Sequence, residues 1–277
     1  MGYYLAIDIG ETKGQLILGH LEENQLKLEE VYQFESLMNQ VDTKGWELKH
    51  LFQEIKEGMK KCKEIGKLPI LVGIDTRDAA IVLLDEENQV LGDVRVVHQK
   101  EEAMALINNL QEEHPEEAKL VKSILFLPDY LNYLLTGVKL CEYTTACCTG
   151  IIDPFAQSWD EELVKTLELP RECYPEIRRP GAVLGNLARA VTEELGYDCI
   201  IVLPATHATS SAYFAFPTSE QLRQDSDYKE VTLHSVEDDT AYSASAVGNL
   251  LVQLIISHEL KDVQEARECV KNSFQLA

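Results

Sequence analysis

The amino-terminal segment contains two strand-like runs joined by a short turn that is rich in glycine. Residues 3–8 alternate and then become apolar, and they lead into the sequence Ile9-Gly10-Glu11-Thr12-Lys13-Gly14. A second strand is expected over residues 15–20. Two strands separated by a short glycine-containing connection predict a β-hairpin, so this part of the chain should belong to a β-sheet.

The sequence after the hairpin mixes strand and helix patterns. Residues 69–75 are nearly all apolar, which predicts a strand in the centre of a sheet. Leu48, Leu51 and Ile55 share one face of a predicted helix over residues 46–65. This mixture predicts an α/β domain. Further strands are expected at residues 26–34, 80–85 and 199–203, and further helices at 104–110, 130–135, 161–167, 246–256 and 263–274.

The length of the chain bears on its domain organisation. At 277 residues it reaches the size at which single cores begin to split into two domains. Residues 217–239 are polar and loop-like. We therefore expect a first domain over residues 1–217, a loop or linker over 218–245 and a helical fragment over 246–277.

The chain is strongly acidic, with 47 acidic residues against 25 basic ones and a formal net charge of -22. A field of this sign repels nucleic acid and anionic membranes, and it slows the approach of ATP unless magnesium accompanies it. No apolar run reaches the roughly 18 residues of a membrane-spanning helix, and the amino terminus shows no basic leader segment. We therefore expect a cytoplasmic protein without a nucleic-acid or membrane partner.

Seven cysteines lie at irregular spacing without a CxxC pair, and Cys147 and Cys148 are adjacent. This arrangement suits neither a zinc site nor a redox motif. Free thiols in a reducing compartment are therefore the expected state.

The glycines of the hairpin turn suggest a phosphate-binding role. Glycine lets the backbone approach a phosphate closely, and the amide groups of the turn can then point at its oxygens. Asp8, at the end of the first strand, could hold a hydrated magnesium ion. The alternative is that the glycines only close the turn.

Three further motifs follow in order along the chain. They are Gly73-Ile74-Asp75-Thr76, then Leu127-Pro128-Asp129-Tyr130-Leu131-Asn132-Tyr133-Leu134-Leu135-Thr136-Gly137 with Glu142-Tyr143-Thr144, and finally Pro204-Ala205-Thr206-His207-Ala208-Thr209-Ser210-Ser211-Ala212. With these motifs the chain resembles the FGGY carbohydrate kinases, and within that family the rhamnulokinases most closely. The resemblance covers residues 3–217 and resumes at Gly248-Asn249-Leu250-Leu251-Val252-Gln253.

This resemblance implies an actin-like, ribonuclease-H-like fold of two domains of the actin and hexokinase type. Mg-ATP would bind between the domains, and its terminal phosphate would pass to a ketose hydroxyl. The residues implied at the nucleotide phosphates are Asp8, Gly10, Glu11, Thr12, Lys13, Gly14 and Gln15, and those implied at the sugar are Asp75, Thr76, Asp78, His207 and Thr209.

The chain departs from the family pattern at several of these positions. The aspartate that serves the family as general base is Ala208 here, and a methyl group cannot accept a proton. The arginine that closes the family's first phosphate loop is Gln15. The second phosphate turn and the adenosine site of the family have no counterpart, so the second domain is truncated. These departures indicate a catalytically impaired kinase homologue.

Alternative interpretations remain open. The chain could be a working sugar kinase whose base is Asp78 or Asp75, or a non-catalytic sugar-binding and regulatory protein. His207 could contact sugar or could be a core histidine with a backbone partner. The apolar helix expected at residues 246–256 could dock on the first domain or pair with a second copy, and the pairing that forms a homo-oligomer is favoured over docking.

Overall fold

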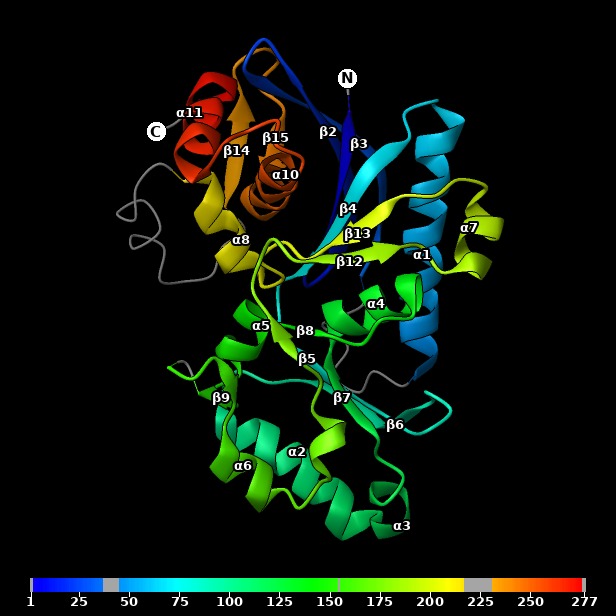
Figure 1. Ribbon diagram of the computed structural model, residues 1–277. Coiled ribbons are helices and arrows are strands. Elements are labelled where there is room, and N and C mark those ends of the chain that lie inside the picture. Colours follow the sequence, from blue (N-terminus) through cyan, green and yellow to red (C-terminus); the bar gives the residue numbers. More distant parts are fainter. Residues whose placement is uncertain (1, 37–44, 154, 217–230, 276–277) are drawn as a thin grey trace.

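The computed structural model describes residues 2–36, 45–153, 155–216 and 231–275, and a six-stranded sheet forms its framework (Figure 1). The order of this sheet is β12-β13-β4-β1-β2-β3. Its strands span Val183–Asn186 for β12, Ile200–Val202 for β13, Pro69–Thr76 for β4, Tyr3–Ile9 for β1, Lys13–Glu22 for β2 and Gln25–Glu35 for β3.

The strand directions agree with the predicted fold class. Strand β1 pairs antiparallel with β2, and β2 pairs antiparallel with β3, which confirms the amino-terminal hairpin. Strand β4 pairs parallel with both β1 and β13, and this confirms its central place in the sheet. An antiparallel hairpin continued by parallel strands is the sheet expected of an actin-like α/β domain.

Different helices cover the two faces of this sheet, and alternate side chains of β1 point to each face. Leu5 and Ile7 of β1 join the apolar cluster that contains helix α1 (Gly45–Glu64), whereas Tyr4 and Ala6 join the cluster that contains helix α10 (Ala244–Ile256). This is the period-two alternation of a strand that is buried on both faces. Helices α8 (Ala208–Ala215) and α11 (Val263–Ser273) share the α10 face.

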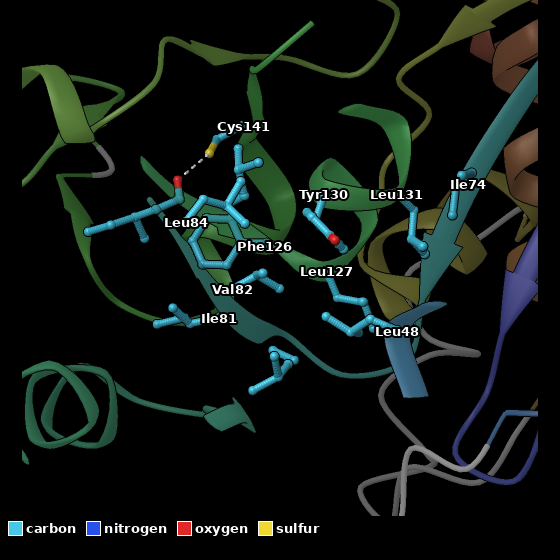
Figure 2. Close-up of a cluster of buried hydrophobic side chains, with 14 of the residues drawn as sticks. Leu48, Ile74, Ile81, Val82, Leu84, Phe126, Leu127, Tyr130, Leu131 and Cys141 are labelled. Carbon is cyan, nitrogen blue, oxygen red and sulfur yellow. Dashed lines mark hydrogen bonds between the residues drawn. The ribbon is translucent and has the colours of Figure 1, made fainter. Parts of the chain in front are cut away.

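A smaller sheet extends the molecule at the other end of β4 (Figure 1). Its order is β6-β5-β7, with β5 over Ala80–Leu84, β6 over Val90–Val96 and β7 over Ser123–Phe126. Figure 2 shows buried side chains running from Ile74 through Leu127 of helix α4 (Leu127–Thr136) to Phe126. The two sheets therefore share one apolar core.

Further elements lie between β6 and β13 in the sequence. They are α2 (Lys100–Glu113), α3 (Pro115–Ala118), β8 (Cys141–Glu142), α5 (Tyr143–Cys148), β9 (Ile152–Asp153), β10 (Ser158–Trp159), α6 (Glu161–Thr166), the 3-10 helix η1 (Arg171–Cys173), β11 (Ile177–Arg178) and α7 (Arg189–Leu195). No helix within the described ranges is both long and apolar enough to cross a membrane.

The expected linker over residues 218–245 differs from the structure in its described part. Strands β14 (Thr232–Ser235), β15 (Ala241–Ser243) and β16 (Phe274–Gln275) form a three-stranded sheet in the order β15-β14-β16. The apolar side chains of Leu233 and Tyr242 are buried in the α10 cluster, which explains why this polar segment is ordered. The predicted boundary at residue 217 lies outside the described residues.

Helix α10 docks within the chain, so the preference for pairing through residues 246–256 was wrong. Its residues are buried from Ala244 to Leu254, against β1, β4 and α8. A Cβ added at Gly248 would lie 1.8 Å from the backbone oxygen of Ser211 on α8. The absence of a side chain at Gly248 therefore allows α8 and α10 to pack backbone against backbone.

We expect Gly248→Ala to destabilise the protein by about 3 kcal/mol or more, because backbone atoms cannot move aside as a flexible side chain can. Urea unfolding at neutral pH measures this loss. Gln264→Ala, at an exposed position of α11, serves as the control and should change the free energy of unfolding by less than about 0.5 kcal/mol. Equal stability of the two variants would contradict the close packing of α8 and α10.

Candidate functional site

The hairpin turn predicted to hold nucleotide phosphate is tightly closed. Gly10 N donates to the carbonyl oxygen of Lys13 at 2.9 Å, and Ser36 Oγ donates to the carbonyl oxygen of Gly10 at 2.7 Å. A Cβ added at Gly14 would lie 2.1 Å from the Phe34 ring. Packing against Phe34 therefore requires a glycine at position 14, whether or not the turn binds phosphate.

Two carboxyl groups lie side by side at the ends of β1 and β4, where Asp8 and Asp75 are register partners. Gln15 Nε2 donates to Asp8 Oδ2 at 2.9 Å. On the other side Asn249 Nδ2, from α10, donates to Asp75 Oδ2 at 2.7 Å and to the carbonyl oxygen of Gly73 at 3.1 Å. Both carboxyl groups are buried, and each accepts a hydrogen bond from an amide side chain. We call Asp8 and Asp75 the buried carboxyl pair.

Burial raises the pKa of Asp75 well above its usual range, and the neighbouring charge of Asp8 raises it further. The hydrogen bond from Asn249 acts in the opposite direction and lowers this pKa. Two ionised carboxylates are difficult to accommodate together in a buried site. The pair is therefore best satisfied when Asp75 carries a proton.

The cationic side chains near the turn are paired with acids of the same chain. Lys13 Nζ lies 3.3 Å from Glu30 Oε2, and Arg77 Nη1 lies 3.1 Å from Glu11 Oε2. These four side chains are partly exposed, so each pair contributes little stability. Their effect is local: they neutralise the positive charge that a phosphate group would otherwise meet.

A second group of polar side chains surrounds the amino-terminal end of α8. Thr76 N donates to the carbonyl oxygen of Thr206 at 2.9 Å, which brings the end of β4 against the residues before α8. His207 Nε2 lies 3.2 Å from the sulfur of Cys148 on α5. Ala208 is the first residue of α8.

Burial lowers the pKa of His207, and the nearby His98 lowers it further, whereas the charge of Asp78 raises it. The imidazole is therefore neutral at pH 7, because the net shift moves its pKa below the ordinary value of 6.5. A neutral imidazole has one nitrogen that can accept a proton.

Glu142 links α5 to the residues before α8 through hydrogen bonds. Its carboxylate accepts from Thr144 N at 2.8 Å, from Thr206 N at 3.1 Å and from Thr206 Oγ1 at 2.9 Å. His207 N in turn donates to Thr144 Oγ1 at 3.3 Å. The backbone of His207 is therefore fixed by bonds to α5, through a carboxylate that is fully buried.

Comparison with known proteins identifies the family. Residues 97–215 match the model of the N-terminal domain of the FGGY family of carbohydrate kinases. This part of the chain is similar to an FGGY kinase N-terminal domain. The matched range includes Glu142, Cys148 and His207, but it does not include the hairpin around Asp8.

Curated relatives of the FGGY domain include two rhamnulokinases. That of Halalkalibacterium halodurans is 36% identical over 249 residues, which cover 78% of this chain and 52% of the relative. That of Bacillus subtilis is 30% identical over 243 residues, which cover 77% and 50%. The chain therefore spans about half the length of the curated relatives it matches.

Solved structures confirm the predicted fold class. The xylulose kinase of Lactobacillus acidophilus superposes with a TM-score of 0.61 at 16% identity, over 78% of this chain and 50% of that one. Plasmodium falciparum glycerol kinase with ADP superposes with a TM-score of 0.59 at 14% identity, over 95% and 65%. The fold is that of the actin-like and hexokinase-like sugar kinases.

The structure divides the predicted site residues into two groups. Asp8 and Gln15 lie together, and Asp75, which was predicted at the sugar, lies with them in the buried pair. Thr76 and His207 lie together at the start of α8, where they form a β-bridge. The predicted residues Glu11, Thr12 and Thr209 are exposed, Asp78 is half-buried and Gly10 is buried.

FGGY kinases use ATP with a divalent metal, and the described residues provide only part of such a site. Lys13 and Arg77 are neutralised by Glu30 and Glu11, and Asp8 accepts a hydrogen bond from Gln15. A nucleotide phosphate would therefore compete with Glu30 and Glu11 for these two cations.

Two residues with prominent contacts were not among the predicted site residues. Asn249 belongs to the motif at residues 248–253, but only the docking of α10 brings it to Asp75. Cys148 lies 59 residues from His207 in sequence. No local pattern signals either contact, because each depends on the packing of distant elements.

We expect Asp75→Asn to stabilise the protein increasingly as pH rises. A group whose pKa is raised by folding contributes stability below its unfolded pKa, near the ordinary value of 3.8, and that contribution is lost as pH rises toward the folded pKa. The difference in unfolding free energy between the variant and the parent should therefore grow above about pH 4, by at most about 1.4 kcal/mol per pH unit. Urea unfolding between pH 5 and 8 measures it.

The control for this experiment is Asp93→Asn, since Asp93 lies at the surface beside Arg95. This substitution should change the free energy of unfolding by less than about 1 kcal/mol, because an exposed ion pair contributes little. A flat difference for Asp75→Asn would show that the buried pair does not carry the proton.

Proposed function

We propose that this chain is a rhamnulokinase-like sugar kinase homologue that retains a ketose-binding surface and is impaired in phosphoryl transfer. The observation that carries this proposal is Ala208 at the first position of α8. The family resemblance implies that the general base of the family stands at this position. General base catalysis contributes about two to four orders of magnitude in rate, so the loss of the carboxylate is a large handicap.

The neighbours of Ala208 support this view. His207, the adjacent residue, shares its Nε2 with the Cys148 thiol at 3.2 Å. Asp75 is fully buried and bonded to Asn249, so its carboxyl group does not face a ligand. Neither side chain is free to replace the base that position 208 lacks.

Impairment on the nucleotide side has separate support. Lys13 and Arg77, the cations near the hairpin turn, are already paired with Glu30 and Glu11. Phosphoryl transfer depends almost wholly on positioning and charge neutralisation. A phosphate that meets only these residues would therefore be held weakly.

The second candidate is a working sugar kinase in which Asp78 acts as the base. Its support is the position of Asp78, whose charge acts on both His207 and Cys148. A third candidate is a non-catalytic sugar-binding protein with a regulatory role. It shares the ketose-binding surface with the main proposal and differs only in having no turnover at all.

We expect the chain to turn over L-rhamnulose at least about a hundredfold below the 1–100 per second typical of kinases. A coupled assay of ketose-dependent ADP formation measures this rate. Ala208→Asp should raise any residual rate by about tenfold or more, because it restores a proton acceptor. The new carboxylate also suits the amino-terminal end of a helix.

Two variants make this assay decisive. Ser210→Asp adds the same charge to the first turn of α8 but on another side of the helix, so it should not raise the rate. If Asp78 contacts the sugar without acting as the base, Asp78→Asn should raise KM and leave kcat unchanged. Turnover of several per second in the parent chain, lost in Asp78→Asn, would favour the second candidate instead.

We expect weak nucleotide binding by the same chain. Isothermal calorimetry with Mg-ATP should give a dissociation constant far weaker than micromolar, since about -8 kcal/mol is needed for micromolar binding. Mg-ADP serves as a comparison, because it lacks the terminal phosphate. A low-micromolar constant would show that the hairpin holds nucleotide without a second half of the cleft.

A further inference from the structure

Two of the seven cysteines, all of which lie in the described part of the chain, are exposed: Cys147 and Cys148. The other five are buried. The exposed pair belongs to α5, at the edge of the group formed by Thr76, Asp78 and His207. A free thiol at this position has access to solvent, which is one of the conditions for reactivity.

Cys148 differs from Cys147 in having an imidazole partner. Its sulfur lies 3.2 Å from His207 Nε2, within the range in which a base activates a nucleophile. Cys147 is instead beside the hydroxyl of Tyr143, because adjacent residues of a helix point about 100° apart. The two thiols therefore have the same chain neighbourhood and different chemical partners.

The imidazole of His207 is a proton acceptor within hydrogen-bond distance of the Cys148 sulfur, although both pKa shifts favour the neutral pair at rest. Burial keeps His207 neutral, so its Nε2 can accept a hydrogen when the other ring nitrogen carries the proton. Burial, followed by the charges of Cys147 and Asp78, raises the pKa of the Cys148 thiol. The resting group is therefore a thiol, and its reaction requires proton transfer to His207.

The position of His207 does not depend on the thiol. Its backbone nitrogen donates to Thr144 Oγ1, and Thr206 before it is held by the carboxylate of Glu142. A parallel bridge to Thr76 fixes the same turn from β4. The backbone of His207 is thus fixed by contacts from three elements, so the imidazole is attached at a defined place beside Cys148.

We propose that Cys148 and His207 form a nucleophilic thiol site that reacts with small disulfides. The Cys148 sulfur attacks one sulfur of RS–SR, a Cys148–SR bond forms and the original S–S bond breaks. His207 takes the thiol proton and returns it to the leaving thiolate, which departs as RSH. Cys148 is oxidised and the leaving group is reduced, so the exchange is balanced. The net charge of -22 favours uncharged or cationic disulfides over anionic ones.

The product should persist until an external thiol removes it. Adjacent Cα atoms are only about 3.8 Å apart, whereas ordinary disulfides need about 4.4 to 6.8 Å. Cys147 is therefore poorly placed to displace the adduct from Cys148 within helix α5. The remaining cysteines are buried and cannot reach it.

The adduct would affect the proposed ketose-binding surface, and this consequence rests on the proposed function. The group attached to Cys148 lies against His207, which is a predicted sugar contact. Oxidised small thiols would therefore compete with sugar for the same position. A sugar-protection experiment tests this consequence separately from the thiol chemistry.

The test uses the whole chain and bis(2-hydroxyethyl) disulfide, a small uncharged probe. Peptide mass spectrometry follows the initial rate of adduct formation at Cys147 and Cys148. We expect Cys148 to react about tenfold faster or more than Cys147, because only Cys148 has a base. His207→Gln should lower the rate at Cys148 to that of Cys147 or below and leave Cys147 unchanged.

The chain contains its own controls. The five buried cysteines should stay unmodified, and their labelling in His207→Gln would reveal unfolding of that variant. The ratio of the two rates in the parent chain decides the proposal even then. A Cys148 that reacts no faster than Cys147, or a rate that a folded His207→Gln leaves unchanged, overturns it.

L-Rhamnulose separates this proposal from the proposed function. If both hold, saturating sugar slows the labelling of Cys148 and not that of Cys147. If Cys148 is selectively labelled and sugar gives no protection, the thiol site stands and the ketose-binding surface fails. If calorimetry detects sugar binding and the labelling is unselective, the ketose-binding surface stands and the thiol site fails.

Discussion

The buried pair of Asp8 and Asp75 connects parts of the chain that are far apart in sequence. Adjacent parallel strands bring the two carboxyl groups together, and a carboxyl group in an apolar core must find hydrogen-bond partners or a proton. Gln15 supplies one partner from the hairpin, and Asn249 supplies another from α10. Helix α10 is therefore tied to the central strands by hydrogen bonds in addition to its apolar face. Loss of the bond from Gln15 or from Asn249 would leave a buried polar atom without its partner.

Close packing of α8 against α10 also helps to fix the position of Asn249 beside the carboxyl pair. Gly248 lets the two helix backbones meet, and α8 begins directly after His207. Gln253, one turn beyond Asn249, donates to Asn249 Oδ1 and to the carbonyl oxygen of Leu5. The positions of the carboxyl pair and of the polar group near α8 are thus set by the same helix pair.

The sequence predicts the hairpin, the central place of β4 and the α/β class, because alternation and continuous apolar runs report directly on burial. The order of the motifs led to the family resemblance, and the resemblance implied the actin-like fold. What it could not supply was the fate of the apolar helix at residues 246–256: a pattern shows that a face must be covered, but it does not say by what. The strands β14 and β15 were hidden in a polar segment, since only Leu233 and Tyr242 bury large side chains there. Contacts such as that of Cys148 with His207 depend on tertiary packing and leave no local signal.

The two groups of predicted residues differ in how far the chain satisfies its own polar atoms. On the hairpin side each charged or polar side chain has an internal partner: Lys13 has Glu30, Arg77 has Glu11 and Asp8 has Gln15. A phosphate there competes with Glu30 and Glu11 for the two cations, so it meets less net positive charge than unpaired cations would offer. Around α8 the balance is different, because Glu142 holds the backbone from below while the thiol of Cys148 remains exposed. The two proposals therefore both concern the side of His207: Ala208 stands at the proposed base position, and the Cys148 sulfur is the proposed nucleophile.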